Sequence, residues 1–445
     1  MNPVFLKELQ DYSQDQLMAL FSFSNKEFLE FATVLSKKKI LFKNKNSYKL
    51  RYVGFFIFNN RLCFSFPKYT KTDDNKLARD LINLFREYSS REKLEEDEIE
   101  TLGSLDYYEH FSLISVIIFI LQDYFDNGIY IDEISTYEID GNGEINWDKT
   151  IENIYAYNLK NQSIYLNFYT DKLLTDEKNI ITTIHKYVLS ECSAYIQKTG
   201  MDLFFEFPNV NFDIEQEEIG SIEFMLSHLQ DEINIQYNDW KQLVLKTLYM
   251  FLSNKSRLNN SNSLSLFGTR SFHNVWEKVC SFVFNSIYSE IKEQGIIDKP
   301  VWELHAGKNQ VESKRTLTPD IITKHSSKGE EYLLILDAKY YNPKFKDKSI
   351  HNTPELEDIT KQYMYELALK DYYIQNGYTK VINAFLFPNE NNEIEVIGKT
   401  SIDFLKKLSL QDITLINIPG SKVYENYIRR QKFSVNEIDN MLEKI

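Results

Sequence analysis

Two kinds of apolar spacing alternate along this chain of 445 residues, and the changes between them divide it into sections. Near the start, "YKLRYVGFFIFNNRLCFSFPKYT" contains two apolar, aromatic runs on either side of Asn59 and Asn60. Asparagine pairs favour the left-handed backbone that a two-residue hairpin turn requires. A short helical pattern precedes this hairpin. The pattern therefore predicts a small β-rich domain over residues 1–104.

The next section, residues 105–260, has mostly helical spacing of its apolar positions. Inside it, "GNGEINWDKTI" predicts a glycine turn followed by a short strand-like piece. The polar segment "NKSRLNNSNSLS" near its end has the composition of a linker, so we place the main domain boundary there. We expect a predominantly helical middle domain, with helices over residues 105–127, 178–196 and, as one helix or two, 221–255.

In the last section, residues 261–445, the spacing of the apolar positions changes again. Its order of helices and strands predicts a small mixed sheet flanked by helices, and the whole chain is then an α+β multidomain protein. The expected elements are a helix over residues 272–294, a strand that begins near Pro319, a continuously apolar strand over 332–336, a helix over 356–375 and a strand over 380–388.

The net charge is -14, which repels phosphate, so a role with nucleic acid needs a local basic surface or a partner that supplies affinity. The charge is uneven, because residues 31–72 contain basic side chains and no acidic one. Such a stretch is either a solvated face or a docking surface for DNA or an acidic partner. The basic residues are Lys37, Lys38, Lys39, Lys43, Lys45, Lys49, Arg51, Arg61, Lys68 and Lys71.

The cysteines and the apolar windows indicate the compartment. Cys63, Cys192 and Cys280 lie far apart and form no CxxC, which argues against a zinc cluster and favours a reducing cytosol. The most apolar window, residues 111–121, is about half of the ~20 residues needed to cross a bilayer. The N-terminus lacks the pattern of a secretory signal. We expect a cytoplasmic protein without a membrane span.

The candidate chemistry lies in "LTPDIITKHSSKGEEYLLILDAKYY". Its apolar run is typical of a central strand, and Asp337 and Lys339 leave the end of that strand on the same side because strand side chains repeat every two residues. Pro319 sets the start of a neighbouring strand, and the polar residues between the two strands form a plausible hairpin connection. The hairpin would bring Asp320 beside Asp337.

Two carboxylates with a backbone carbonyl between them are suitable oxygen ligands for Mg²⁺, for which Mn²⁺ could substitute. We expect Asp320, Asp337 and the Ala338 carbonyl to hold the ion. Lys339 would position or help to deprotonate an attacking water and offset phosphate charge. This chemistry is metal-assisted phosphodiester cleavage. The simpler alternative is a surface hairpin on which the aspartate and the lysine form an ion pair.

The ordered set of these motifs resembles the PD-(D/E)xK nuclease fold. In that fold a helix ahead of the core strands often contributes an acid, and the resemblance assigns this role to Glu277, as a ligand of a second metal ion or an orienter of water. The alternative for Glu277 is an ion pair with Lys278 or Lys314. Gln362, in "DITKQYMYEL", resembles the polar residue that the superfamily often places beside the active lysine; its alternative is an exposed helix residue.

The blocks "RYVGFFIFNNRLCFSFPKY", "NGEINWDKTI" and "FGTRSFHNVWEKVC", together with the site motifs, resemble the LlaJI-type restriction endonucleases, relatives of the McrC nuclease subunits. The similarity runs from about residue 50 to about residue 390. It implies a Mg²⁺-dependent DNA endonuclease subunit of a McrBC-like restriction, or antiphage, system. It also implies a McrB-like AAA+ GTPase partner that docks through the N-terminal half. The chain has no GxxxxGK[ST], so nucleotide hydrolysis must come from another polypeptide.

Two other functions stay open at this point. The chain could be a non-catalytic adaptor that assembles and activates a motor ring, or a stand-alone repair or transposition nuclease. The intact Pro-Asp and Asp-Ala-Lys motifs favour activity. Copurification with an AAA+ GTPase would support the restriction subunit, and activity of the chain alone would support the stand-alone nuclease.

Overall fold

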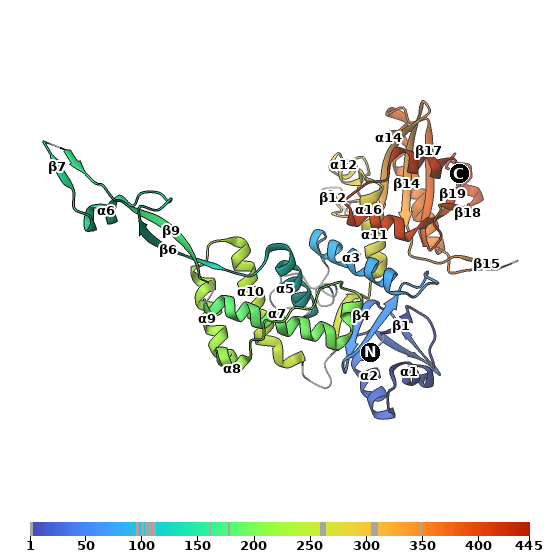
Figure 1. Ribbon diagram of the computed structural model, residues 1–445. Coiled ribbons are helices and arrows are strands. Elements are labelled where there is room, and N and C mark those ends of the chain that lie inside the picture. Colours follow the sequence, from blue (N-terminus) through green and yellow to red (C-terminus); the bar gives the residue numbers. More distant parts are fainter. Residues whose placement is uncertain are drawn as a thin grey trace. The chain divides into compact units, whose positions relative to one another are not determined.

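The computed structural model describes residues 3–94, 98, 102, 113–160, 162–176, 179–258, 264–303, 310–346 and 349–445. The chain forms two compact units (Figure 1). Unit 1 contains Met1–Ser112, Leu203–Phe205 and Leu264–Ile445, and unit 2 contains Leu113–Asp202 and Glu206–Ser263. The first and last of the three ranges suggested by the sequence therefore share one unit, because strands from both ranges pair in one sheet.

The shared sheet has the strand order β1-β5-β4-β10. Its hairpin is the predicted one: β4 and β5 are antiparallel, and Asn59 and Asn60 join them with φ angles of 50° and 58°. Two capped helices pack on this sheet, with Phe21 and Phe31 against Phe56. The elements are β1 (Val4–Lys7), α1 (Gln14–Phe21), α2 (Asn25–Lys37), β2 (Leu41–Asn44), β3 (Ser47–Leu50), β4 (Val53–Phe58), β5 (Arg61–Phe66) and β10 (Leu264–Thr269).

The predicted linker is not a linker throughout. Its first residues belong to the end of α10 (Asp239–Leu258), residues 259–263 lie outside the described part of the chain, and its last residues begin β10. Gly268 of β10 pairs with Gly54 of β4. Their φ angles are 155° and 130°, and a Cβ on Gly54 would lie 2.4 Å from the Phe267 carbonyl oxygen. Only glycine allows the two backbones to approach so closely.

Unit 2 consists of helices and a two-stranded arm. The helices predicted over residues 178–196 and 221–255 are confirmed, whereas residues 105–112 of the first predicted helix lie outside the described part. The helices are α5 (Leu113–Asn127), α7 (Ile180–Thr199), a 3-10 helix (Met201–Leu203) that follows α7 and crosses into unit 1, α8 (Gln216–Ile219), α9 (Ile222–Ile235) and α10. In the described residues, no helix has the length and apolarity that a bilayer span requires.

The arm, residues 132–176, extends away from the helices of unit 2 (Figure 1). Its stem is an antiparallel pair, and smaller elements lie farther out. The strand-like piece predicted after the glycine turn is wrong: Trp147–Asn153 is a helix, because the Asn146 side chain accepts from the Lys149 amide and caps it. The elements are β6 (Asp132–Ile139), α6 (Trp147–Asn153), β7 (Tyr157–Leu159), β8 (Gln162–Ile164) and β9 (Tyr169–Asp176).

The predicted C-terminal mixed sheet is confirmed, with the order β13-β14-β17-β19-β18. Strands β14, β17 and β19 are parallel, and both edge strands are antiparallel. The helix predicted over residues 272–294 is broken after Phe284, where Asn285 has φ 54°. The strands are β13 (Ile321–Ser327), β14 (Glu330–Ala338), β17 (Lys380–Asn389), β18 (Glu395–Thr400) and β19 (Ile413–Pro419).

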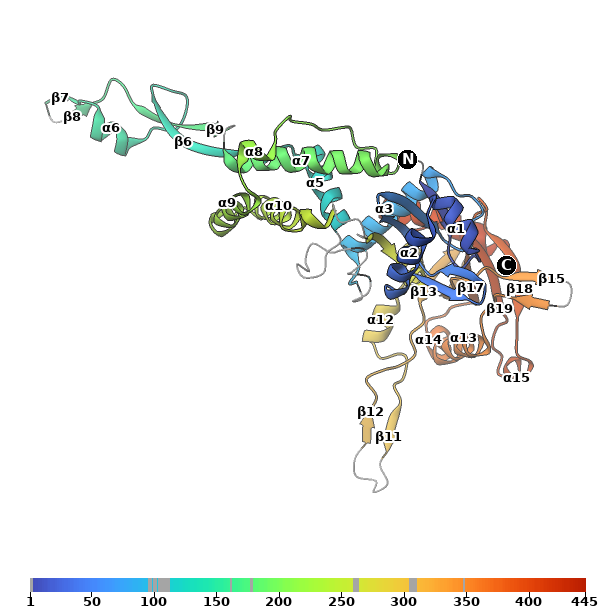
Figure 2. The same cartoon turned by 90° about the horizontal axis from the view of Figure 1, so that it is seen from below.

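Helices flank this sheet, and two hairpins project from it; Figure 2 shows the hairpin β11–β12. Helix α3 joins the two halves of unit 1, because Arg91 donates to the Tyr427 carbonyl of α16 and Glu87 pairs with Arg430. The elements are α3 (Asn75–Arg91), α11 (Phe272–Val283), α12 (Tyr288–Glu293), β11 (Val301–Glu303), β12 (Gln310–Glu312), β15 (Lys344–Lys346), β16 (Ser349–His351), α13 (Leu356–Ala368), α14 (Lys370–Gln375), α15 (Asp403–Lys406), α16 (Gly420–Ile428) and α17 (Val435–Leu442).

The close approach of Gly54 to Gly268 predicts that Gly54→Ala strongly destabilises the fold. A Cβ at this position meets the backbone of β10, so the variant must separate the two strands, and we expect a loss of about 2 kcal/mol or more in unfolding free energy. Thermal unfolding measures the effect. The control is Gly295→Ala, which also has positive φ but has no atom within 4 Å of a new Cβ, so it adds backbone strain alone. Equal loss in the two variants would contradict the packing argument.

Candidate active site

The hairpin β13–β14 brings Asp320 to the end of β14, as its sequence predicts. Ile321 pairs with Leu336, and Lys328 and Gly329 form the turn with φ angles of 52° and 79°. Asp320 lies just before β13, and its Oδ2 accepts a hydrogen bond from the Ala338 amide at 2.9 Å. The Pro-Asp and Asp-Ala-Lys motifs are therefore joined by a direct contact.

Asp337 and Lys339 lie on one face of the sheet. Leu333 and Ile335 share a core cluster with Tyr365 of α13, so the alternation along β14 places Asp337 on the face that α13 covers. The Lys339 Nζ lies 2.8 Å from Asp337 Oδ2. The Asp337 side chain is only 6% exposed, so this pair is buried rather than the surface ion pair of the alternative reading.

Asp358 of α13 is a member of the cluster that the sequence did not reveal to us. Its Oδ1 lies 3.1 Å from Lys339 Nζ, so the ammonium sits between two carboxylates. Its other oxygen accepts from the Glu355 amide and caps α13. A signal existed in the sequence, because Asp358 precedes Gln362 by four residues and thus shares its helix face.

Gln362 is fully buried, so it is not the exposed helix residue of the alternative reading. Its Nε2 donates to the carbonyls of Ile335 and Ala384, at 3.0 and 3.4 Å, on two adjacent parallel strands. Its Oε1 has no partner within the described residues. Gln362 therefore fastens α13 to β14 and β17, and Asp358 is the α13 residue that reaches Lys339.

Glu277 lies on α11, beside the end of β14. The neighbouring Trp276 Nε1 is 3.4 Å from the Leu386 carbonyl, which also accepts from the Lys339 amide at 2.9 Å. Burial raises the pKa of Glu277 to about 7, and the charge of Asp337 adds to this while Lys339 opposes it. Glu277 thus lies in the electrostatic field of the cluster. Where the structure describes the chain, it forms no ion pair with Lys278 or Lys314.

The cluster contains more carboxyl groups than its single lysine can neutralise. Burial, the charge and hydrogen bond of Asp337, and the charge of Glu277 hold the pKa of Asp320 well above its usual range. The described residues contain no ready-made group of three or more His, Cys, Asp or Glu ligands. Mg²⁺ often needs only one or two protein carboxylates, because it keeps several waters. Asp320 and Asp337 fit that requirement.

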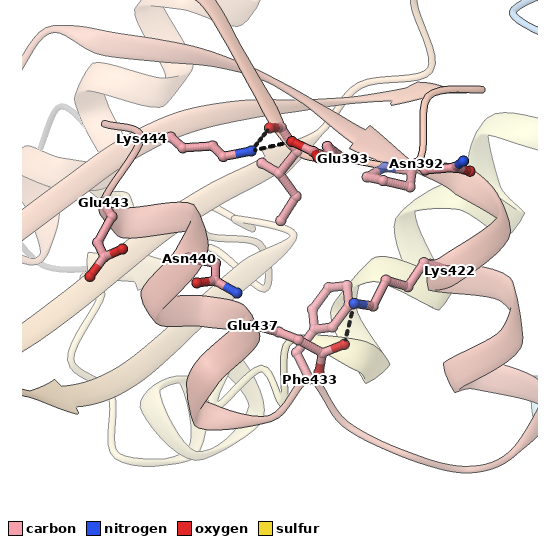
Figure 3. Close-up of a pocket in the computed structure, with 10 residues that line it drawn as sticks. Asn392, Glu393, Lys422, Phe433, Glu437, Asn440, Glu443 and Lys444 are labelled. Carbon is pink, nitrogen blue, oxygen red and sulfur yellow. Dashed lines mark hydrogen bonds and ion pairs between the residues drawn. The ribbon is translucent and has the colours of Figure 1, made fainter.

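A separate pocket of about 560 Å³ lies near the C-terminus (Figure 3). Its charged groups are paired: Lys422 with Glu437 at 2.7 Å, Lys444 with Glu393 at 3.2 Å, and Glu443 with Lys328 at 2.7 Å. None of the predicted site residues lines it. We therefore assign the chemistry to the cluster at the end of β14.

Comparison with known proteins identifies the class. The family model described as LlaJI restriction endonuclease matches residues 52–420, and the chain belongs to that family. The type II restriction enzyme BsuMI component YdjA of Bacillus subtilis (strain 168) is 31% identical over 453 residues, which cover 99% of this chain and 92% of that relative. The chain is thus a restriction-system nuclease component, and the predicted resemblance to the LlaJI-type restriction endonucleases is confirmed.

A solved structure was also matched. It is a half-complex from a tetradecameric assembly of Thermococcus gammatolerans McrB AAA+ hexamers with bound McrC, with a TM-score of 0.40 and 11% identity. The match covers 99% of this chain and 100% of that chain. A likeness this distant carries no conclusion about the residues of this chain.

The raised pKa of Glu277 predicts a pH-dependent effect of Glu277→Gln on stability. Between about 4.5 and about 7 the folded state binds more protons at this group than the unfolded state, so the unfolding free energy falls as pH rises through that window. Without divalent ions, the variant should unfold at a higher temperature than the wild type at pH 8, and the gain should vanish toward pH 4.5. Thermal scans in EDTA measure it.

The matched control is Glu293→Gln, an exposed carboxylate on α12, which should shift the unfolding temperature little at either pH. A gain for Glu277→Gln that stays constant from pH 4.5 to pH 8 would contradict the assignment of the raised pKa.

Proposed function

We propose that this chain is the Mg²⁺-dependent DNA endonuclease subunit of a McrBC-like restriction system, with a PD-(D/E)xK site. The observation that carries the proposal is the connected, partly buried cluster of Asp320, Asp337, Lys339 and Asp358 at the end of β14. Family membership supports the nuclease activity, and the cluster supplies the two carboxylates and the lysine that such chemistry requires. The substrate is DNA, and Mn²⁺ would serve in place of Mg²⁺.

Each residue has a proposed role. Asp320 and Asp337 would hold the ion with the Ala338 carbonyl, and a bound Mg²⁺ would supply Lewis-acid polarisation of the phosphoryl oxygen. Glu277 would orient water or help to hold a second ion. Asp358 is a positioning residue, because it acts through Lys339.

The protonation state of Lys339 limits what its side chain can do in the reaction. Burial alone would lower its pKa, but the charges and hydrogen bonds of Asp337 and Asp358 outweigh burial and raise the pKa. Lys339 is therefore an ammonium at neutral pH. We propose that it orients the attacking water and offsets the negative charge that develops on the phosphate, rather than accepting the proton.

The proposed partner is the McrB-like AAA+ GTPase that the family resemblance implies, and the arm offers a place for it. Contiguous exposed apolar side chains on a soluble surface usually mark an interaction site. They gather on the outer part of the arm, in the N-terminal half where docking was expected: Trp147, Ile151, Tyr155, Tyr157, Leu159 and Leu166. We place partner docking on this surface.

The adaptor and the stand-alone nuclease remain the competing functions. The intact, connected cluster supports catalysis over an adaptor role, and the apolar arm supports a partner over independent action. Fragments of the chain divided near residue 255 would not separate nuclease activity from partner binding cleanly. The reason is that β10, which would lie in the C-terminal fragment, completes the sheet of the N-terminal section. Point variants are therefore the better test.

We predict that Asp337→Ala and Lys339→Ala each abolish DNA cleavage in Mg²⁺ and that Asp320→Asn is similarly inactive. The variants should stay folded, because Lys339 keeps Asp358 as a partner when Asp337 is removed. Gel assays of cleavage and thermal unfolding measure the two properties. Asp371→Asn, an exposed carboxylate on α14, is the control and should cut like the wild type. Cleavage at near wild-type rate by either Ala variant would contradict the assignment of the active site.

We predict that Tyr155→Ser combined with Tyr157→Ser prevents copurification with the AAA+ GTPase and stimulation of its GTP hydrolysis. The reason is loss of apolar contact area, since Tyr155 is 96% exposed and free to bind a partner. Binding of DNA by the chain should not change. Tyr237→Ser, at a side chain 92% exposed in the same unit, is the control. If the control weakens partner binding as much as the double variant, the arm is not the docking surface.

A further inference from the structure

A groove of about 510 Å³ opens beside the cluster at the end of β14. Its wall begins at Tyr341 and Asn342, and the Tyr341 amide donates to the Lys339 carbonyl at 2.9 Å, one tight turn from the proposed active lysine. The opposite wall comes from the N-terminal section, including Lys7 of β1 and Lys49 of β3. The groove therefore lies inside unit 1 and adjoins the site without being part of it.

The groove is strongly basic in an acidic protein. Lys7, Lys49, Lys68 and Lys344 line it, with Glu8 as the one carboxylate among the described lining residues. Glu8 is buried and accepts a hydrogen bond from the Tyr340 hydroxyl at 2.6 Å. The groove thus has the opposite sign of charge to the chain as a whole, whose net charge is -14, and it attracts anions.

The lysines are held in place to differing degrees. The Lys68 Nζ lies 4.3 Å from the centre of the Tyr340 ring, and its amide donates to the Tyr340 hydroxyl at 3.1 Å. Lys49 pairs with Asp11 at 3.0 Å. Lys7 and Lys344 form no ion pair with any residue in the described ranges. Two lysines of the groove are thus available to a ligand, and a third is fixed on an aromatic ring.

We propose that this groove binds the sugar-phosphate backbone of one DNA strand next to the scissile bond. The inference rests on the proposed function and deepens it, because it makes the N-terminal section part of the DNA-binding surface. Gln10, Asn342 and Asn352 add neutral polar groups that can donate hydrogen bonds to phosphate oxygens. Continuity with a phosphodiester-cleaving site favours a nucleic acid strand over an acidic peptide.

The groove also separates the long basic stretch into two parts. Lys49 and Lys68 line the groove, whereas Lys37, Lys38 and Lys39, at the end of α2 and just after it, do not. Docking of DNA and docking of a partner, which the sequence left as alternatives for the whole stretch, would then involve different residues.

The test compares two double charge reversals in the full-length chain. Lys7→Glu with Lys344→Glu changes the groove, and Lys26→Glu with Lys37→Glu changes two exposed lysines of α2 by the same total charge. Binding of a fluorescein-labelled single strand of about 12 nucleotides is measured by anisotropy in EDTA over a range of salt. Thermal unfolding checks that both variants are folded.

The groove variant should bind the strand roughly tenfold or more weakly at low salt, and its log–log salt slope should fall by about 1.4 because two phosphate contacts are lost. The control should keep the wild-type slope. Equal losses in the two variants overturn the proposal. So does a groove variant that loses affinity for an oligoglutamate peptide but not for DNA, which would assign the groove to an acidic protein segment.

Failure of the groove and failure of the proposed function give different results. Asp337→Ala should bind the labelled strand at least as tightly as the wild type, because binding in EDTA does not use the ion and the substitution removes a carboxylate that repels phosphate. If the groove variant binds normally while Asp337→Ala abolishes cleavage, the proposed DNA-binding groove is wrong and the nuclease assignment holds. A wild-type chain that binds no DNA overturns the groove, and the cleavage assay then decides the nuclease separately.

Discussion

The active-site cluster depends on the Lys339 ammonium, which is held between the carboxylates of Asp337 and Asp358 at the end of a buried strand. A charge removed from water is tolerated when it is paired, and each of the two carboxylates gives the ammonium a partner. One carboxylate comes from the strand and the other from α13, and Gln362 fastens that helix to the same strands. The mixed sheet and α13 thus surround one charged group.

The N-terminal section is in direct contact with the residues that follow β14. Tyr340, the residue after Lys339, donates to Glu8 beside β1, and Gly54 of β4 lies against Gly268 of β10. The strand that carries the active lysine therefore ends in a contact with the first residues of the chain. This hydrogen bond links the N-terminal section directly to the residue that follows Lys339.

The distribution of charge explains how an acidic chain can handle DNA. Its net charge of -14 repels phosphate at a distance, but lysines gather in the groove beside the cluster. The acidic groups of the site are buried and partly neutralised by Lys339, so they contribute less to the outer field than their number suggests. A partner that brings DNA close would complement such a surface, since the groove acts mainly at short range.

The sequence by itself determined the local features. Periodicity located the Asn59–Asn60 hairpin, the strands β13 and β14 and most helices, and the alternation along β14 placed Asp337 and Lys339 together, because these features depend on neighbours in the chain. Tertiary structure alone decided that Asp358 reaches Lys339, that Gln362 turns to the strand carbonyls, and that β10 (Leu264–Thr269) closes the N-terminal sheet by pairing with β4 (Val53–Phe58). Each of these contacts joins segments distant in sequence, and their pairing depends on how whole faces pack, which no local pattern records.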